Sequence, residues 1–226
     1  MAHPAVMQPP VTREPGAGVY NEKLGMWVFL GSEVMFFTAL IGSYIILRTA
    51  HPEGWAQPGQ ILAVPITAVN TFLLICSSVT MVKAFAAAQE GFQKGLRGWL
   101  VATVLIGATF VGVQVYEYQQ LIHHGFTPAG YVEGSELAEA AASGAAYEEG
   151  PALPASAGLY GSTFYTMTGF HGFHVTVGVI CMIFVTIRAF RGRYTAADHR
   201  GVEVVGLYWH FVDLVWIILF TIVYLI

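Results

Sequence analysis

Five ionisable side chains lie inside long apolar stretches of this chain, where a lipid environment should exclude them. They are Glu33, His171, His174, His210 and Asp213. An ionisable group near the middle of a membrane helix costs about 2.5 kcal/mol or more unless protein or water compensates it. Carboxyl and imidazole groups can ligate metals, relay protons or join helices by hydrogen bonds. These residues are therefore the first candidates for function.

Metal or haem ligation is the first chemistry to weigh. His171 and His174 are three residues apart, so both could point at one site from a single helix. However, an HxxH pair is a weak signal, and a metal or haem centre would also need ligands from other helices at the same depth. We therefore predict no metal site and no catalytic residue in this chain. A haem-binding redox protein remains as an alternative.

A proton or substrate path is the second possibility, because buried acids and histidines are typical of pumps and transporters. Transporters commonly have repeated halves and broken helices, and the sequence shows neither. A self-contained proton-coupled transporter therefore also remains only as an alternative. The third possibility is that hydrogen bonds between these side chains hold the helices together, since lipid provides no hydrophobic drive for helix association.

Glu33 differs from the other buried groups because its own apolar segment offers it no basic neighbour. The residues on either side, 27–32 and 34–37, are almost wholly apolar. A carboxyl in such surroundings can hold or relay a proton, although composition does not decide whether Glu33 does so.

The other buried polar residues are predicted to pack helices. Glu203, His210 and Asp213 share one helix stripe, and we expect it to face the interior together with Glu33. Glu117 and His171 have similar depths in neighbouring segments and are expected to lie within reach of each other, directly or through water. The full set of predicted packing residues is Asn70, Gln114, Glu117, His171, His174, Glu203, His210 and Asp213.

The elements that position these residues are membrane helices. The chain has 226 residues, of which 55% are hydrophobic and 11% charged, and its mean hydropathy is +0.60. Soluble domains carry about 25% charged residues, so this is a membrane protein. Windows of about 20 apolar residues can span a bilayer, and five occur at about 24–48, 61–87, 97–122, 159–189 and 203–226. The predicted fold is an all-α bundle of five transmembrane helices, in which residues 21–226 form a single domain after a disordered tail at 1–20.

Basic residues predict the orientation of the bundle, because Lys and Arg near segment ends stay cytoplasmic. One side receives only Arg48. The other side carries Arg13, Lys23, Lys83, Lys94, Arg97, Arg188, Arg191, Arg193 and Arg200. We therefore expect a cytoplasmic N-terminus and a C-terminus outside. Membrane lipids and membrane proteins are the expected partners, and nucleic acid is not.

The link at about 123–158 is predicted to be an acidic outer loop. It holds five acids and no Lys or Arg: Glu133, Glu136, Glu139, Glu148 and Glu149. Residues 136–142 are compatible with a short helix, but nothing in the link indicates a folded domain. It is either a solvated surface loop or a docking surface for a basic partner.

Three motifs resemble subunit III of the haem-copper cytochrome c oxidases. They are KLGMWVFLGSEVMFF at 23–37, GLYGSTFYTMTGFHGFHV at 158–175 and YWHFVDLVW at 208–216. Weaker agreement runs through Asn70 and Thr71, through Gln114, Glu117 and Tyr118, and through Arg188 and 199–203. The first motif resembles the family's helix with a carbodiimide-reactive glutamate, here Glu33, and the resemblance implies that Glu33 is the functional, proton-related carboxylate. The resemblance covers about 21–226 apart from the acidic loop.

This resemblance implies a non-catalytic subunit of a proton-translocating oxidase in the bacterial inner membrane. Haem and copper are then expected in the partner subunits I and II, and no cofactor in this chain. Subunit III would stabilise subunit I and support proton uptake during oxygen reduction. Phospholipid is a further expected ligand, with headgroups at Arg188, Arg191 and Arg193. The acidic loop would face cytochrome c or a cytochrome-containing subunit. Subunit III of a quinol oxidase, or an accessory subunit of a nitric oxide reductase, is the alternative.

Overall fold

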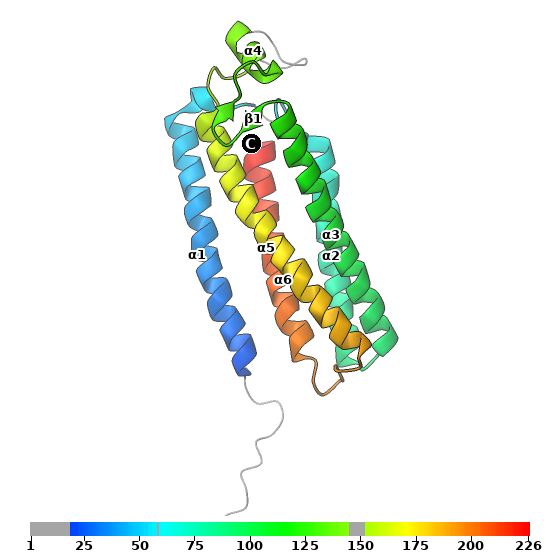
Figure 1. Cartoon of the computed structure of the whole chain (residues 1–226). Coiled ribbons are helices and arrows are strands. Elements are labelled where there is room, and N and C mark those ends of the chain that lie inside the picture. The colour runs from blue at the N-terminus through cyan, green and yellow to red at the C-terminus, as the bar shows by residue number, and fades with distance from the viewer. Residues whose placement is uncertain (1–18, 58, 145–151) are drawn as a thin grey trace, which may run out of the picture.

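The computed structural model describes residues 19–57, 59–144 and 152–226. Within these ranges, five helices are long and apolar enough to cross a membrane. They are α1 (Asn21–Ala50), α2 (Val64–Gln89), α3 (Gln93–His123), α5 (Gly158–Phe190) and α6 (Arg200–Phe220), which continues into a π-helical turn, η2 (Thr221–Leu225). The predicted five-helix bundle is confirmed (Figure 1). Most of the predicted tail, 1–18, lies outside the described residues.

α6 is the centre of the bundle. It packs against α1, α2 and α5, while α2 and α3 form a closely packed antiparallel pair. Half of the most apolar window of α6 is buried within the chain, against 6% of that of α1, which packs mainly on α5 and α6. The exposed apolar side chains of α1 must therefore face lipid or another protein.

Small residues let the helices approach α6 closely. A methyl group at Gly107 of α3 would lie 2.7 Å from the ring of Trp209, and one at Gly178 of α5 would lie 3.0 Å from it. The indole Nε1 of Trp209 donates a hydrogen bond of 2.9 Å to Ser77 Oγ on α2. Trp209 thus joins α2, α3 and α5 to α6, by close packing against two glycines and by one hydrogen bond.

A small cap closes the end of the bundle at which α1 and α3 end. A short hairpin, β1 (Phe126–Thr127) and β2 (Gly130–Tyr131), precedes α4 (Glu136–Ser143), and a 3₁₀ turn, η1 (Pro52–Gly54), follows α1. Ser135 caps α4 by accepting from the Ala138 amide, and Gly144 ends it with a left-handed φ of 61°.

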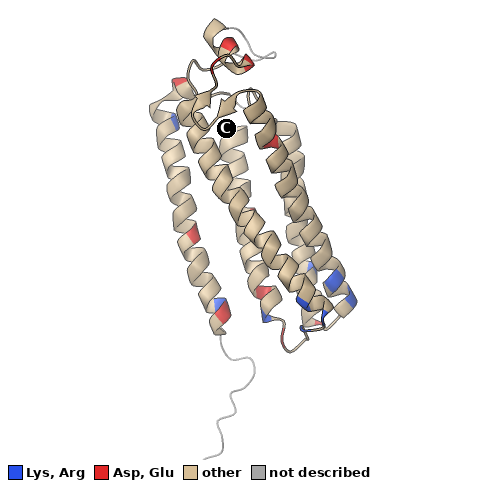
Figure 2. Ribbon diagram, viewed as in Figure 1, with Lys and Arg blue, Asp and Glu red and all other residues tan. Residues whose placement is uncertain are grey.

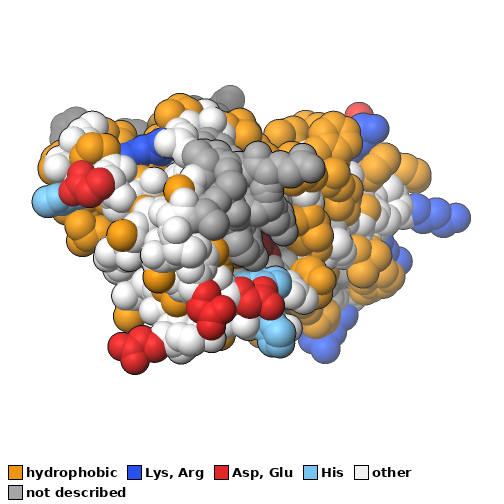
Figure 3. All heavy atoms as spheres, turned by 90° about the horizontal axis from the view of Figure 1, so that it is seen from above, with side chains coloured by type: hydrophobic (Ala, Val, Ile, Leu, Met, Phe, Trp, Pro, Cys, Tyr) orange, Lys and Arg blue, Asp and Glu red, His pale blue; other side chains and the backbone are white. Residues whose placement is uncertain are grey.

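The prediction of a short helix in the acidic link is confirmed. However, the link also contains the hairpin, whose Phe126 side chain is fully buried. The view onto this end shows acidic and histidine side chains at the surface (Figure 3). Glu148 and Glu149 lie outside the described residues.

The described Lys and Arg side chains gather at the opposite end, apart from Arg48 (Figure 2). Hydrogen bonds tie the elements of this basic end together, since Gln93 donates to the Tyr194 carbonyl and Arg97 to that of Ala189. At the capped end, Arg48 hydrogen-bonds the carbonyls of Ile222 and Ile226 and so joins α1 to η2. The charge asymmetry used to predict the orientation is therefore present in three dimensions, and the cytoplasmic assignment of the basic end remains a prediction.

Candidate functional site: polar pairs within the membrane helices

Glu33 of α1 forms a pair with His174 of α5. The distance from Glu33 Oε2 to His174 Nε2 is 3.0 Å, and His174 Nδ1 lies 2.7 Å from the Phe170 carbonyl oxygen. A carbonyl only accepts, so Nδ1 carries a hydrogen. The contact between Nε2 and the carboxyl then needs one further proton, which lies either on Glu33 as the acid or on His174 as imidazolium. The pair therefore holds one shared proton and has no net charge in either form.

Aromatic rings surround this pair and leave it partly open. Phe37 meets the His174 ring edge-on at a centroid distance of 5.2 Å, and the Tyr208 hydroxyl donates to the His174 carbonyl at 2.9 Å. The side chains of His174 and Glu33 are still 12% and 17% exposed. The sequence prediction treated His174 as a packing residue and did not pair it with Glu33. The sequence signal that could have predicted this pair is that the His174 imidazole and the Glu33 carboxyl both lack a partner within their own apolar segments.

The predicted joint cluster of Glu33 with the polar stripe of α6 is wrong. Glu33 turns to α5, while His210 Nδ1 and Ser78 Oγ on α2 hydrogen-bond at 2.8 Å. Asp213 lies close to both Ser78 and His210 and is 6% exposed. Glu203 is separate from both groups at the basic end. The three carboxyl groups thus occupy three different sites, because Glu33 lies on α1 and turns to α5, while Glu203 and Asp213 on the α6 stripe meet different neighbours along its length.

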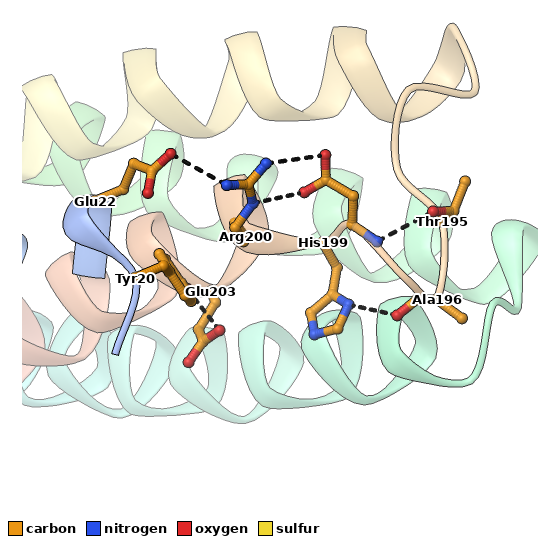
Figure 4. A network of polar contacts seen from close by, with 8 residues as sticks. Tyr20, Glu22, Thr195, Ala196, His199, Arg200 and Glu203 are labelled. Carbon is orange, nitrogen blue, oxygen red and sulfur yellow. Dashed lines mark hydrogen bonds and ion pairs between the residues drawn. The ribbon is translucent and has the colours of Figure 1, made fainter. Parts of the chain in front are cut away.

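At the basic end, Glu203 accepts hydrogen bonds from Lys23 Nζ at 2.5 Å and from the Tyr20 hydroxyl at 2.7 Å. Burial, with the bond to Glu203, raises the pKa of Tyr20 above its ordinary value, so this phenol remains a donor. Arg200 joins Glu22 to Asp198 (Figure 4). Hydrogen bonds from Arg200 lower the pKa of Asp198 below its ordinary value. This network ties the start of α1 to the start of α6, and sequence reasoning named neither Tyr20 nor Lys23 as a partner of Glu203.

Glu117 and His171 make no direct hydrogen bond, so the direct form of the predicted contact is wrong, and the form through water remains a prediction. Glu117 Oε1 accepts from Thr67 Oγ1 at 3.0 Å and from the Tyr224 hydroxyl at 3.1 Å. His171 is fully buried and stacks on Trp216 at a centroid distance of 4.7 Å. Neither ring nitrogen of His171 has a hydrogen-bond partner among the described residues. His171 and His174 therefore do not converge on a common ligand.

Asn70 and Gln114 make hydrogen bonds to the backbone of neighbouring helices. Asn70 Nδ2 donates to the Phe110 carbonyl of α3 at 3.3 Å, and Gln114 Nε2 donates to the Thr168 carbonyl of α5 at 2.9 Å. A methyl group at Gly172 would lie 2.8 Å from Gln114 Oε1, so this glycine makes room for the amide. These geometries are those of helix packing.

Two of the three predicted lipid-contacting arginines line one groove. It has a volume of about 440 Å³, and its polar wall includes Arg188, Arg193 and Arg200, while Phe184 and Val205 belong to its apolar wall. Arg191 is exposed and does not line it. A groove with guanidinium groups beside apolar side chains suits a phospholipid headgroup with its acyl chain.

Metal ligands do not converge anywhere in the part of the chain that the structure describes. No three His, Cys, Asp or Glu side chains within it form a group that could hold a metal ion. The polar groups present are arranged as pairs and hydrogen-bonded networks. Their chemistry is proton sharing and helix attachment.

Comparison with known proteins gives a consistent result. The family model described as "Cytochrome c oxidase subunit III" matches residues 17–144 and 141–226. A protein named "Probable cytochrome c oxidase subunit 3" from Mycobacterium bovis is 40% identical over 207 residues, covering 90% of this chain and 87% of that protein. "Cytochrome c oxidase subunit 3" of Thermostichus vulcanus is 36% identical over 203 residues, covering 89% and 86%. "Quinol oxidase subunit 3" of Bacillus spizizenii is 33% identical over 202 residues, covering 89% and 85%.

Proposed function

This chain belongs to the cytochrome c oxidase subunit III family, and we propose that it serves as the non-catalytic third subunit of an aerobic oxidase in the bacterial inner membrane. Residues 21–226 act as one transmembrane domain that stabilises the catalytic subunit. The basic end faces the cytoplasm, because Lys and Arg concentrate there. The cap of β1, β2 and α4 faces outward.

The Glu33–His174 pair is the observation that carries a role in proton uptake. It shares one proton across a 3.0 Å contact, and both side chains keep some exposure. Glu33 is 12 residues from the start of α1, about 18 Å along the helix. In the proposed orientation, the pair can receive a proton from the cytoplasmic side. It can then release that proton along the surface of the protein. Its function is to hold a proton beside the partner that consumes it.

Haem and copper are assigned to partner subunits I and II. The described residues of this chain do not bring three potential ligands together, so the donors among those residues do not fit a metal centre. When bound in the partners, those groups supply the redox chemistry. This chain contributes packing, the proton pair, and the groove that includes Arg188 and Arg193, for which we propose a phospholipid headgroup as ligand.

Cytochrome c is the proposed electron donor. The outward cap carries Glu133, Glu136 and Glu139, and an anionic surface there would steer a basic protein such as cytochrome c or a cytochrome-containing subunit. A quinol oxidase is the second candidate, because "Quinol oxidase subunit 3" is 33% identical to this chain. Purifying the complex and comparing its oxygen consumption with reduced cytochrome c and with quinol separates the two. Absence of haem proteins from the purified complex would contradict the proposed function.

The substitution Glu33→Gln tests the proton pair. We expect the complex to assemble with an unchanged visible haem spectrum, because glutamine keeps the size and hydrogen-bonding capacity of the side chain. Proton uptake and oxygen consumption should fall severalfold, because an amide cannot give up the shared proton. Both rates are measured on the purified complex. Glu90→Gln, at an exposed carboxyl at the end of α2, is the matched control and should leave them unchanged. Loss of the complex in Glu33→Gln would instead show a structural role, and unchanged rates would remove Glu33 from proton uptake.

A further inference from the structure

A pocket opens at the capped end of the helix pair formed by α2 and α3. It has a volume of about 470 Å³ and lies between the first turn of α2 and the last turns of α3. Its walls are mostly apolar and include Ile61, Pro65, Ile66, Tyr116 and Leu121. Its polar side chains are those of Glu117, Gln120 and His124. Among the described residues, no Lys or Arg lines this pocket.

Glu117 is the buried polar group of the pocket. The residue is 6% exposed, and its Oε1 accepts hydrogen bonds from Thr67 and Tyr224. Its Oε2 receives no hydrogen bond from the described residues and is not enclosed by them, since Glu117 lines the pocket. Glu117 also takes part in none of the ion pairs among the described residues. The fold therefore fixes one carboxyl oxygen and leaves the other open to a ligand.

Gln120 and His124 add further acceptors at the exposed side of the pocket. His124 Nδ1 lies 2.9 Å from the Gln120 carbonyl oxygen. A carbonyl only accepts, so Nδ1 carries a hydrogen, and Nε2 of the neutral ring is an acceptor. The side-chain amide oxygen of Gln120 is also an acceptor. All three polar side chains can thus accept hydrogen bonds, and a ligand that suits them must supply donors.

The depth of Glu117 in the bilayer makes an amphiphile the fitting ligand. α3 has 31 residues and is about 46 Å long, so a hydrocarbon layer of about 30 Å leaves about 8 Å of a centred helix at each end. Glu117 lies six residues before His123, the last residue of α3, which is about 9 Å along the helix. The carboxyl is therefore at the boundary between the hydrocarbon layer and the headgroups. Ile66 and Val69, which share a helix face and are 40% and 62% exposed, continue the apolar wall toward the bilayer centre.

We propose that this pocket binds a lipophilic amine, whose ammonium group donates a hydrogen bond to Glu117 Oε2 and whose apolar body lies against Pro65, Ile66 and Leu121. A hydrogen bond between an ammonium and a carboxylate is about twice as strong as one between neutral groups. A phosphate group does not suit the pocket, because no described Lys or Arg lines it to neutralise the phosphate charge and the Glu117 carboxylate repels that charge. The ligand is accordingly a free amine and not an amino phospholipid. This binding activity goes beyond the proposed function and is the same whichever electron donor the complex uses.

Zero-length crosslinking with a hydrophobic carbodiimide tests where the amine binds. The carbodiimide activates a carboxyl group, and an amine held beside it displaces the activating group, so that an amide forms and the carbodiimide leaves as a urea. With octylamine as the probe, the expected product in the purified complex is an octylamide at Glu117, found by mass spectrometry of its peptide. Glu33, whose carboxyl is paired with His174, is the internal control and should give much less octylamide. Equal yields at Glu117 and Glu33, or none at Glu117, would overturn the assignment.

Titration calorimetry on the purified complex tests the role of charge. Octylamine should bind about tenfold more tightly than octanol, because hydrogen bonds to charged groups are stronger than those between neutral groups. Glu117→Gln should weaken octylamine binding about tenfold and leave octanol binding unchanged. Glutamine keeps an acceptor oxygen for Thr67 and Tyr224, so the unfolding transition of this variant should stay close to that of the native chain. Equal affinities for octylamine and octanol, or an unchanged octylamine affinity in Glu117→Gln, would contradict the proposal.

Two tryptophan variants and a lipid competitor test the pocket and the source of the amine. Ile66→Trp fills the pocket from its apolar wall and should reduce octylamine binding at least tenfold. Ile75→Trp is the matched control, since Ile75 is equally 40% exposed on the same helix but lies outside the pocket, and it should bind octylamine normally. Phosphatidylethanolamine supplied in nanodiscs should not displace octylamine. Equal loss in both variants would exclude this pocket as the site, and displacement by phosphatidylethanolamine would assign the ammonium group to a phospholipid and overturn the choice of a free amine.

Discussion

Replacing Trp216 with alanine should lower the free energy of unfolding by about 3–5 kcal/mol, the range for deleting a buried aromatic side chain. The indole is 1% exposed at the centre of α6. It stacks on His171 and meets Phe110 edge-on at a centroid distance of 5.0 Å. Its Nε1 donates to Thr71 Oγ1 on α2 at 2.9 Å. One side chain therefore contacts α2, α3 and α5 at once, and its removal leaves a cavity that all three border.

The loss should exceed that expected from packing alone because His171 depends on the same ring. Both nitrogens of this buried imidazole lack partners among the described residues, and the stacked indole fixes its orientation. Unfolding in mixed detergent, followed by circular dichroism, measures the change. Trp216→Phe should recover part of the stability, since it restores ring packing without the hydrogen bond. Trp27→Ala, at a side chain 60% exposed on α1, is the control and should cost less than about 1 kcal/mol. Equal losses at Trp27 and Trp216 would show that Trp216 is not a centre of packing.

Sequence reasoning located the membrane helices correctly because a lipid environment allows few alternatives. Backbone amides and carbonyls in a bilayer must be satisfied within the segment, so a window of sufficient apolar length becomes a helix. Three of the five predicted windows lie within longer helices; the fourth, 159–189, is part of α5, which spans Gly158–Phe190. Polar residues at the ends do not stop a helix that leaves the bilayer.

Sequence reasoning failed mainly in pairing side chains between helices. α5 has 33 residues and is therefore about 50 Å long, well beyond an apolar layer of about 30 Å, so it must tilt or extend past the bilayer. Depth counted from its ends is then a poor guide, and His171 is not paired with Glu117. The rotation of α5 about its own axis matters as much for which side chains meet, since His171 and His174 are three residues apart and contact different helices. Neither tilt nor rotation is encoded in hydropathy.

The hairpin in the outer cap was missed for a different reason. Its strands have two residues each, too short to show an alternating pattern. The informative residues are glycines. Gly125 and Gly130 have φ values of +91° and +104°, which side chains with a Cβ rarely adopt. Two glycines that each precede an aromatic residue, Gly125 before Phe126 and Gly130 before Tyr131, can thus form a hairpin with a buried ring even among acids and alanines.

Gly161 of α5 is the residue on which the cap rests. A methyl group there would lie 2.4 Å from the carbonyl oxygen of Thr127, and a backbone atom cannot turn aside as a flexible side chain can. The Tyr165 hydroxyl donates to the Phe126 carbonyl at 2.8 Å just beyond this contact. Any larger side chain at Gly161 must therefore push the hairpin away from α5.

We expect Gly161→Val to detach the hairpin at a cost of roughly 3–5 kcal/mol, which combines steric strain with the exposure of the Phe126 ring. The acids of the cap make the change measurable, because a protease specific for glutamate can cut after Glu133, Glu136 or Glu139 only when the cap is loose. Cleavage in the folded variant should therefore be much faster than in the native chain. Gly112→Val on α3, where a methyl group would meet nothing within 4 Å, controls for the effect of valine in a helix. Unchanged cleavage in Gly161→Val would mean that the cap is held by its own contacts and not by its packing on α5.

If the cap does loosen, the aromatic residues beneath it become exposed. Tyr224, which donates a hydrogen bond to Glu117, is one of them. The small hairpin would then control the bond from Tyr224, one of the two hydrogen bonds that the described residues give to Glu117, the other coming from Thr67.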